Sequence, residues 1–125
     1  MQATAFAVSL NVAEPAASAR FLIEHLGFTE QMSADGFVSL VHEGARANVI
    51  YLRTGLSSFK PASAAGSAGD GLLIVLIVED IDTEYARLRD AGVPIVTPIE
   101  TEEWGERYFQ MSDPNGVIIQ LVQWV

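Results

Sequence analysis

The stretch EWGERYFQMSDPNG, residues 103–116, holds the side chains best suited to binding a small molecule. Trp104 stands in a polar loop between Glu103 and Gly105, and an exposed indole offers a flat stacking surface to a planar or cationic ligand. Arg107 follows, and its guanidinium can pair with a carboxylate or carbonyl group of a ligand. Two plainer interpretations stay open. Trp104 could instead cover a sheet end or a dimer seam, and Arg107 could pair with a neighbouring glutamate.

Chemistry by a metal or a nucleophile finds little support in the residue types. The chain has no cysteine and only two histidines, which excludes thiolate metal sites and cysteine nucleophiles. We expect His25, on a predicted helix, to be structural. His42 and Glu43 are adjacent on a predicted strand and point to opposite faces, so they would not converge on an ion. No Ser-His-Asp set, phosphate-binding loop or dinucleotide fingerprint is visible. We interpret four further carboxylates as a solvated acidic rim, namely Glu100, Glu102, Glu103 and Glu106.

Composition narrows the class of protein further. Half of the 125 residues are hydrophobic and 18% are charged, which is typical of a globular chain with a buried core. The net charge of −9 argues against nucleic acid, whose binding depends on lysine and arginine. No apolar run approaches the roughly 18 residues of a membrane helix, and no secretory signal pattern opens the chain. We therefore expect a cytoplasmic protein with neither a nucleic-acid nor a membrane partner.

The elements that position these residues follow from hydrophobic periodicity, which switches between two and about three and a half residues. In the first half, residues 6–12 alternate as a strand does. Pro15 opens a helix and Gly27 ends it. Hairpin turns then separate three further predicted strands, at residues 28–33, 37–42 and 47–53.

The second half repeats this order of elements. Residues 72–78 predict a strand, and a helix over 81–91 is capped by Asp80 or Asp82. Further strands follow at 93–98, 108–111 and 117–122, with the turn of the last hairpin at residues 113–116. The sequence therefore predicts an α+β fold of two βαβββ modules forming a curled mixed sheet with a concave ligand cup. We expect one domain over residues 1–125, with modules at about 1–59 and 71–125 and a mobile linker at about 60–70.

The segments FLIEHLGF, residues 21–28, and WGERYFQMSDPNGVIIQL, residues 104–121, resemble the vicinal oxygen chelate superfamily. This group includes glyoxalase, extradiol dioxygenases and bleomycin-resistance proteins. The run Trp-Gly-x-Arg-x-Phe-x-x-x-Asp-Pro-x-Gly is its most specific part and is similar to the closing hairpin of the bleomycin-binding members. The resemblance implies modules that curl into partial barrels, with a ligand cup on their concave faces, and a homodimer.

The resemblance also allows the family's metal site to be tested against this chain. Enzymes of the family hold a divalent metal with His, Gln and Glu side chains from four strands. The corresponding positions are Ala7, Leu73, a position at or near Tyr51, and Gln120. Alanine and leucine carry no donor atom. We therefore expect no metal and no other cofactor.

Binding by shape is then the leading hypothesis. We predict a metal-independent protein of the bleomycin-resistance type that sequesters a small, aromatic or cationic organic molecule. The alternative is a lyase, isomerase or dioxygenase-like enzyme with a non-standard or absent metal site, including a metal-free catalyst that uses Tyr51, Arg107 or a loop glutamate. The faces occupied by Phe37, Tyr108 and Trp124 are not settled by the sequence. The predicted ligand-binding residues are Trp104, Arg107, Tyr51, Gln120, Ser9, Leu73, Tyr108 and Phe37.

Overall fold

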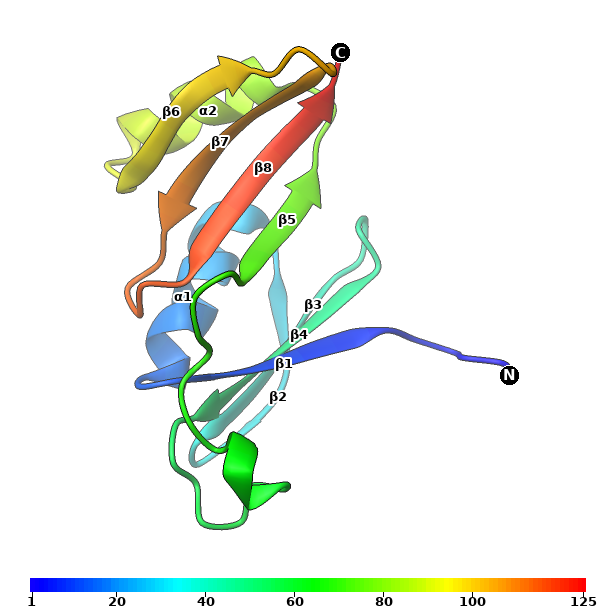
Figure 1. Ribbon diagram of the computed structural model, residues 1–125, viewed down its shortest axis with the longest axis vertical. Helices are drawn as coiled ribbons and strands as arrows, with labels where there is room; N and C mark the ends of the chain where they lie inside the picture. Colours follow the sequence, from blue (N-terminus) through cyan, green and yellow to red (C-terminus); the bar gives the residue numbers. More distant parts are fainter. The chain divides into compact units, whose positions relative to one another are not determined.

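A computed structural model describes residues 1–125 and divides the chain into two compact units, Met1–Asp70 and Gly71–Val125 (Figure 1). Each unit contains a four-stranded mixed sheet and one main helix, in the order βαβββ. The predicted α+β fold of two βαβββ modules is thereby confirmed. The helices are 12 and 10 residues long, and neither has the length and apolar character needed to cross a membrane.

In the first unit, the sheet order is β1-β4-β3-β2. The β1–β4 pair is parallel, and the other two pairs are antiparallel. A short 3-10 helix, η1, follows the last strand. The elements are β1 (Ala7–Val12), α1 (Pro15–Leu26), β2 (Thr29–Ala34), β3 (Phe37–His42), β4 (Ala47–Arg53) and η1 (Ala62–Ala64).

The second unit repeats the arrangement with the sheet order β5-β8-β7-β6. Its β5–β8 pair is parallel, as the β1–β4 pair is in the first unit. The strands of its last two hairpins are longer than the sequence predicted. The elements are β5 (Leu73–Ile77), α2 (Ile81–Asp90), β6 (Ile95–Thr101), β7 (Glu106–Ser112) and β8 (Ile118–Trp124).

Helix α1 begins and ends where the sequence predicted. Pro15 occupies the first turn, where its missing N–H costs no hydrogen bond. Gly27 adopts φ 74° beyond the last turn, and its N–H donates to the Leu22 carbonyl. Phe28, directly after the helix, packs edge to face on His42 of β3 at 5.2 Å. The helix therefore covers the sheet face to which His42 belongs.

Helix α2 covers the equivalent face of the second sheet (Figure 1). The sequence did not decide between Asp80 and Asp82 as the N-cap of this helix. The N-cap is Asp80, because its Oδ1 accepts a hydrogen bond from the Thr83 N–H at 3.2 Å. Tyr85 packs on Phe109 of β7 with ring centroids 4.9 Å apart. Phe109 and the helix residues Ile81 and Leu88 are fully buried. In both units, then, the helix and one sheet face form the core.

The Gly/Ala/Ser-rich segment that follows β4 was expected to be a mobile linker. In the structure, it makes hydrogen bonds to the first unit. The Asn11 side-chain amide donates to the carbonyls of Ala64 and Gly66, at 3.1 and 2.9 Å. The Ala68 N–H donates to the Asn11 carbonyl at 2.9 Å. This segment thus lies against β1, on the side to which Asn11 points.

Candidate binding face of the second unit

Each sheet has an open face, the side that does not carry the helix. In the second unit, strand pairing arranges the open face in rows that cross the sheet, because paired residues point to the same side. One row consists of Ile77, Val122, Tyr108 and Glu100, the next of Val75, Gln120, Gln110 and Thr97, and the last of Leu73, Ile118 and Ser112. Sequence reasoning placed Leu73 and Gln120 on this face, and the register agrees with that placement.

Two tryptophans flank the outer end of this face. Trp124 pairs with Glu106 and is 57% exposed. Trp104 lies in the β6–β7 turn and is 68% exposed. The next residue, Gly105, accepts a hydrogen bond from the Val125 N–H at 2.8 Å, so the turn lies against the end of β8. The two indoles therefore belong to the same end of the sheet.

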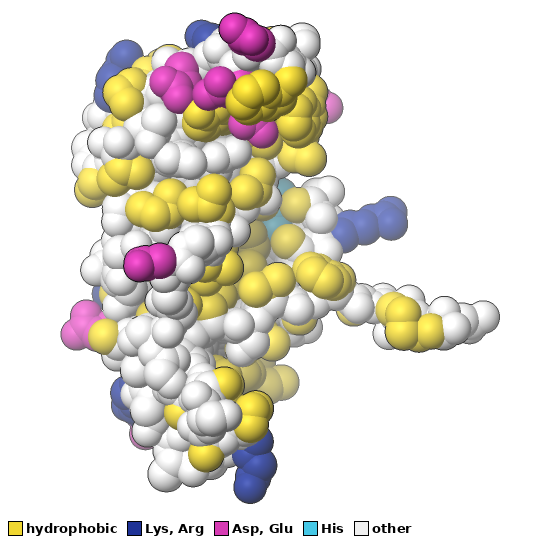
Figure 2. Space-filling view, viewed as in Figure 1, with side chains coloured by type: hydrophobic (Ala, Val, Ile, Leu, Met, Phe, Trp, Pro, Cys, Tyr) yellow, Lys and Arg dark blue, Asp and Glu magenta, His cyan; other side chains and the backbone are white.

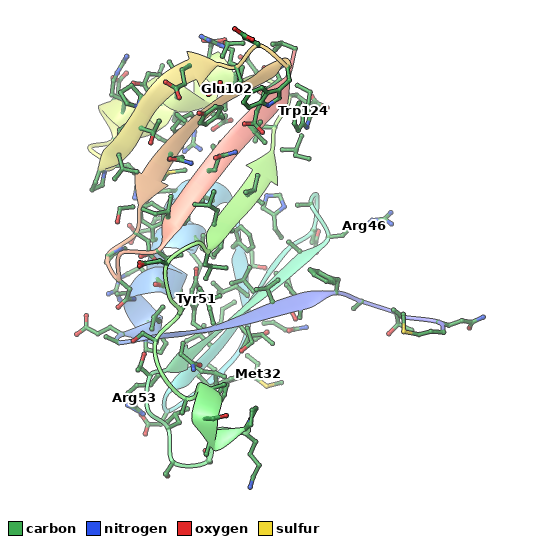
Figure 3. The ribbon with its side chains drawn as sticks, viewed as in Figure 1. Met32, Arg46, Tyr51, Arg53, Glu102 and Trp124 are labelled. Atoms are coloured by element: carbon green, nitrogen blue, oxygen red, sulfur yellow. The ribbon has the colours of Figure 1, made fainter.

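Tyr108 lies on the open face, and its hydroxyl contacts two carboxylates. Its hydroxyl oxygen is 2.6 Å from Glu100 Oε1 and 2.8 Å from Glu102 Oε1. Hydrogen bonds to these two carboxylates raise the pKa of Tyr108 above its usual range, so the hydroxyl stays protonated. Figure 3 shows Glu102 and Trp124 at this end of the sheet. Hydrophobic and acidic side chains accordingly lie side by side here (Figure 2).

A chain of amide hydrogen bonds crosses the next row. The Thr97 hydroxyl donates to Gln110 Oε1 at 2.6 Å, and Gln110 Nε2 donates to Gln120 Oε1 at 2.8 Å. Gln120 is 7% exposed. The chain of hydrogen bonds fixes the orientation of the Gln120 amide.

Arg107 does not belong to this face. It alternates with Tyr108 along β7 and points to the side that helix α2 covers. Its guanidinium forms two hydrogen bonds with Asp82 of that helix, at 2.6 and 3.2 Å, and a third with the Thr101 hydroxyl at 2.8 Å. The prediction that Arg107 orients a ligand therefore receives no support from the geometry. The structure instead shows the plainer alternative, in which Arg107 pairs within the protein. Its partner is Asp82 and not a glutamate.

The open face of the first unit carries Ser9 and Phe37, as their pairing with Ile50 and Leu52 indicates. It is more polar than its counterpart. Ser39 Oγ donates to Gln31 and accepts from the Asn48 amide, at 2.9 and 3.0 Å. These side chains bond to one another across three strands. On the same side of β1, Asn11 Oδ1 is buried without a hydrogen-bond partner.

Tyr51 also lies away from the open faces, contrary to its predicted place in the cup. It pairs with Leu10 and Val38, which are buried on the helix-covered side of the first sheet, and it is itself fully buried (Figure 3). The prediction erred by one residue of register, and a shift of one residue moves a strand side chain to the opposite face. The open-face positions of β4 are Asn48, Ile50 and Leu52.

The family's divalent metal does not fit these residues. Ala7 and Leu73 have no donor atom, and correcting the register of β4 puts Ile50 or Leu52 at the position assigned to Tyr51. Gln120 Oε1 already accepts from Gln110. Within neither unit do three His, Cys, Asp or Glu side chains gather closely enough to hold a metal ion.

A groove of about 520 Å³ lies elsewhere, in the first unit, beside the start of helix α1. Alanines and Pro15 line much of it, and Arg53 on its wall pairs with Asp35 at 3.0 Å. Phe37 is the only predicted binding residue that borders it. The groove is therefore distinct from the face on which the aromatic side chains gather.

Sequence reasoning missed two parts of the binding face. The alternation over residues 118–124 places Trp124 on the same side as Gln120, but the last strand was predicted to end at residue 122. Glu100 and Glu102 were interpreted as a solvated rim. Their approach to one hydroxyl depends on the β6–β7 register, which contains irregularities that no periodicity reveals.

Comparisons with known proteins agree with this architecture. Residues 4–121 match the Glyoxalase/Bleomycin resistance protein/Dioxygenase superfamily. A Mycobacterium bovis protein, Mb0911c, is 37% identical over 62 residues, which is 50% of this chain and 39% of that protein, so the match spans well under half of the relative.

Solved structures share the fold over the whole chain. A glyoxalase/bleomycin resistance protein/dioxygenase from Nocardioides has a TM-score of 0.79 at 23% identity, covering 100% of this chain and 85% of that one. TnmS3, an antibiotic binding protein from Streptomyces sp. CB03234, has a TM-score of 0.75 at 22% identity, covering 99% and 98%. On the strength of the sequence match and the two βαβββ units, the chain belongs to the glyoxalase/bleomycin resistance protein/dioxygenase superfamily.

Proposed function

We propose that the protein binds a small, planar organic molecule, without covalent chemistry or a metal, on the open face of the second unit. The observation that carries this proposal is the exposure of large apolar side chains on that face. Ile77 is 71% exposed, and the two tryptophans at the same end are more than half exposed. Clustered apolar exposure of this kind marks binding surfaces in folded proteins.

The composition of the face supports the same proposal. Small-molecule sites are mostly apolar and carry a few fixed polar groups that orient the ligand. Here β5 supplies Leu73, Val75 and Ile77, the indoles supply stacking surfaces, and the Gln110–Gln120 pair supplies oriented amides. TnmS3 shows that the fold serves antibiotic binding in at least one relative. Sequestration of a related class of molecule is the role that we propose for this chain.

The enzymatic alternative has less support because two of its three candidate groups are buried or paired within the protein. Tyr51 is buried under helix α1, and Arg107 is paired with Asp82. Of the residues that the sequence offered for a metal-free catalyst, only the loop glutamates remain. They lie beside Tyr108, whose raised pKa makes it a poor proton donor at neutral pH.

We also propose that two copies of the chain associate. The exposed apolar residues of β5 lie on an edge strand, which is a common site of self-association. Light scattering at micromolar concentration should give the mass of a dimer. A monomer mass would refute this part of the proposal.

Truncation of Trp104 tests the binding proposal. Stacking contributes roughly 0.5–1.5 kcal/mol beyond area burial, so Trp104→Ala should weaken the affinity for a planar ligand by about tenfold. The melting temperature should change little, because the indole is largely exposed. Calorimetric titration with a panel of planar aromatic compounds measures the affinity.

Ile23→Ala, on the exposed side of helix α1, is a matched control that removes a half-exposed apolar side chain elsewhere. It should leave the affinity unchanged. A large loss of stability in Trp104→Ala with undiminished affinity would instead make Trp104 a structural residue.

A further inference from the structure

A histidine side chain holds the turn between β3 and β4. His42 is the last residue of β3, and its Nδ1 accepts a hydrogen bond from the Ala45 N–H at 3.0 Å. An imidazole nitrogen can accept a hydrogen bond only when it carries no proton, so the ring is neutral in this arrangement and its proton is on Nε2. The turn is therefore closed by a side chain whose hydrogen-bonding capacity depends on pH.

The backbone of the turn makes this hydrogen bond important. Beyond the strand pairing, one backbone bond closes the turn, from the Arg46 N–H to the Glu43 carbonyl at 3.2 Å. Arg46 lies at the tip of the hairpin (Figure 3) and has φ 53°, in the left-handed region that no other non-glycine residue of the chain adopts. That conformation is unfavourable for a residue with a Cβ and persists only where surrounding contacts hold it. Without the His42 bond, the turn would have little to hold it.

The imidazole ring lies between this turn and the end of helix α1. A Cβ at Gly44, in the turn, would lie 3.2 Å from the ring Cε1, and a Cβ at Gly27 would lie 3.3 Å from Nε2. Gly27 directly follows α1, and a positive charge near a helix C-terminus is stabilised by the helix dipole. Protonation of His42 would therefore favour its contact with the helix end while the turn loses its acceptor.

No ion pair fixes the ring in either protonation state. The titratable and charged groups on the elements around it are Glu43 and Arg46 in the turn, Glu24 and His25 near the end of α1, and Glu30 on β2. On β4, the residue that pairs with His42 is Ala47, which is uncharged. His42 forms a salt bridge with none of these carboxylates. The hydrogen bond from Ala45 is accordingly the contact that protonation changes most directly.

We infer that His42 is a pH-dependent latch of the β3–β4 turn. The neutral ring closes the turn by accepting from the Ala45 N–H. The protonated ring carries an N–H at both nitrogens, cannot accept, and releases the turn. Histidine is the only side chain that ordinarily changes its charge between about pH 5 and 8, so the release occurs on mild acidification. The inference concerns the first unit and goes beyond the proposed function.

Nuclear magnetic resonance of the nitrogen-15-labelled chain, titrated from about pH 8 to pH 5, tests the latch. At the higher pH, the ring nitrogens of His42 should show the tautomer with the proton on Nε2. On acidification, the Ala45 amide proton should move towards the shift of a free amide, with the same midpoint as the ring. Its protection from hydrogen exchange should fall by about three- to tenfold, as expected for the loss of one hydrogen bond.

The turn of the last hairpin is a matched control in the same sample. There, Asp113 Oδ1 accepts from the Asn115 and Val117 N–H groups at 2.8 and 2.9 Å. Carboxyl groups usually titrate below this pH range, so the shifts of these two amides should stay constant.

Two variants separate the histidines, of which the chain has only two. His42→Asn places an acceptor oxygen near the former position of Nδ1 and does not titrate, so the Ala45 amide should stay hydrogen-bonded at both ends of the pH range. His25→Asn should leave the response of Ala45 as it is in the wild-type chain. Melting temperatures of both variants check that each is folded.

Three results would overturn the inference. A His42 ring that titrates while the Ala45 amide stays unchanged would show that the turn does not depend on the ring. The tautomer with the proton on Nδ1 at the higher pH would exclude the hydrogen bond. An undiminished response of Ala45 in His42→Asn would assign the change to another group. The first two results come from the wild-type chain alone, so they decide even if His42→Asn does not fold, and none of the three bears on the proposed function of the second unit.

Discussion

The two units share one topology, yet their open faces differ in chemistry. On the first sheet, the open face carries a network of Ser39, Asn48 and Gln31, and Asn11 binds the segment that follows β4. On the second sheet, the corresponding face exposes aliphatic side chains from β5 and ends in tryptophans and glutamates. Of these two equivalent surfaces, one has polar side chains that form hydrogen bonds within the protein, and the other exposes aliphatic side chains to solvent.

The helix-covered faces show no such difference. In both units, the helix buries leucine, isoleucine or phenylalanine side chains against buried apolar residues of the strands. The fold therefore needs only one side of each sheet for its core. The other side can vary without loss of the architecture, and it is there that the two units diverge in composition.

The largest effect on stability should come from the covered side of the first sheet. Tyr51→Ala should lower the free energy of unfolding by about 3–5 kcal/mol, because it leaves a cavity at a fully buried aromatic position. Ligand affinity of the folded fraction should not change. Urea denaturation followed by circular dichroism measures the stability, and Tyr51→Phe serves as the volume-conserving control. Unchanged stability with weakened binding would show that Tyr51 belongs to the ligand site.

A smaller effect is expected at the tip of the β6–β7 hairpin. Gly105 has φ 91°, and a Cβ added there would lie 2.7 Å from the Val125 carbonyl oxygen. Gly105→Ala should cost about 1–3 kcal/mol and should weaken binding, because it displaces the turn that carries Trp104. Gly92 has φ 80° with open space around it, so Gly92→Ala is a control for backbone strain alone. If both variants bound ligand as the wild-type chain does, the position of the turn would be irrelevant to binding.

The smallest effect concerns Arg107. Arg107→Ala should lower the melting temperature only slightly, since the Asp82 carboxylate is largely exposed, and should leave ligand affinity unchanged. Arg20→Ala, at an exposed position on α1, is the matched control. A marked loss of affinity would show that Arg107 reaches the ligand after all.

The same pair predicts a pH dependence. The hydrogen bond from Arg107 lowers the pKa of Asp82. Its contribution to stability is therefore present above the ordinary pKa of aspartate and is lost as the pH falls through the lowered value. The difference in melting temperature between the wild-type chain and Arg107→Ala should thus be seen at neutral pH and should vanish in strongly acidic solution.

Much of the fold could be predicted from local signals. Pro15 and Gly27 bound helix α1, and the turn after β7 follows from Asp113, whose Oδ1 accepts from the Asn115 and Val117 N–H groups. Alternation correctly placed Ser9, Leu73 and Gln120, because the side-chain period of a strand is fixed at two.

The site was less predictable because it depends on strand register and on which residue each charged side chain pairs with. Tyr51 was placed by a resemblance that was one residue out of register, which reverses its face. The choice of Asp82 as partner for Arg107 depends on how α2 lies on the sheet, and the sequence does not encode that contact in any spacing. The approach of Glu100 and Glu102 to Tyr108 likewise follows from irregular pairing between β6 and β7.

Placing one positive charge on each open face tests most directly the claim that the second unit's face binds the ligand. Val75 and Ser9 are exposed residues of the equivalent edge strands β5 and β1, so Val75→Arg and Ser9→Arg are matched changes. Calorimetric titration with a planar ligand should show that Val75→Arg weakens binding by at least about tenfold, while Ser9→Arg leaves the affinity within about twofold of wild type. Undiminished affinity in Val75→Arg, or an equal loss in both variants, would contradict the assignment of the site to the second unit's open face.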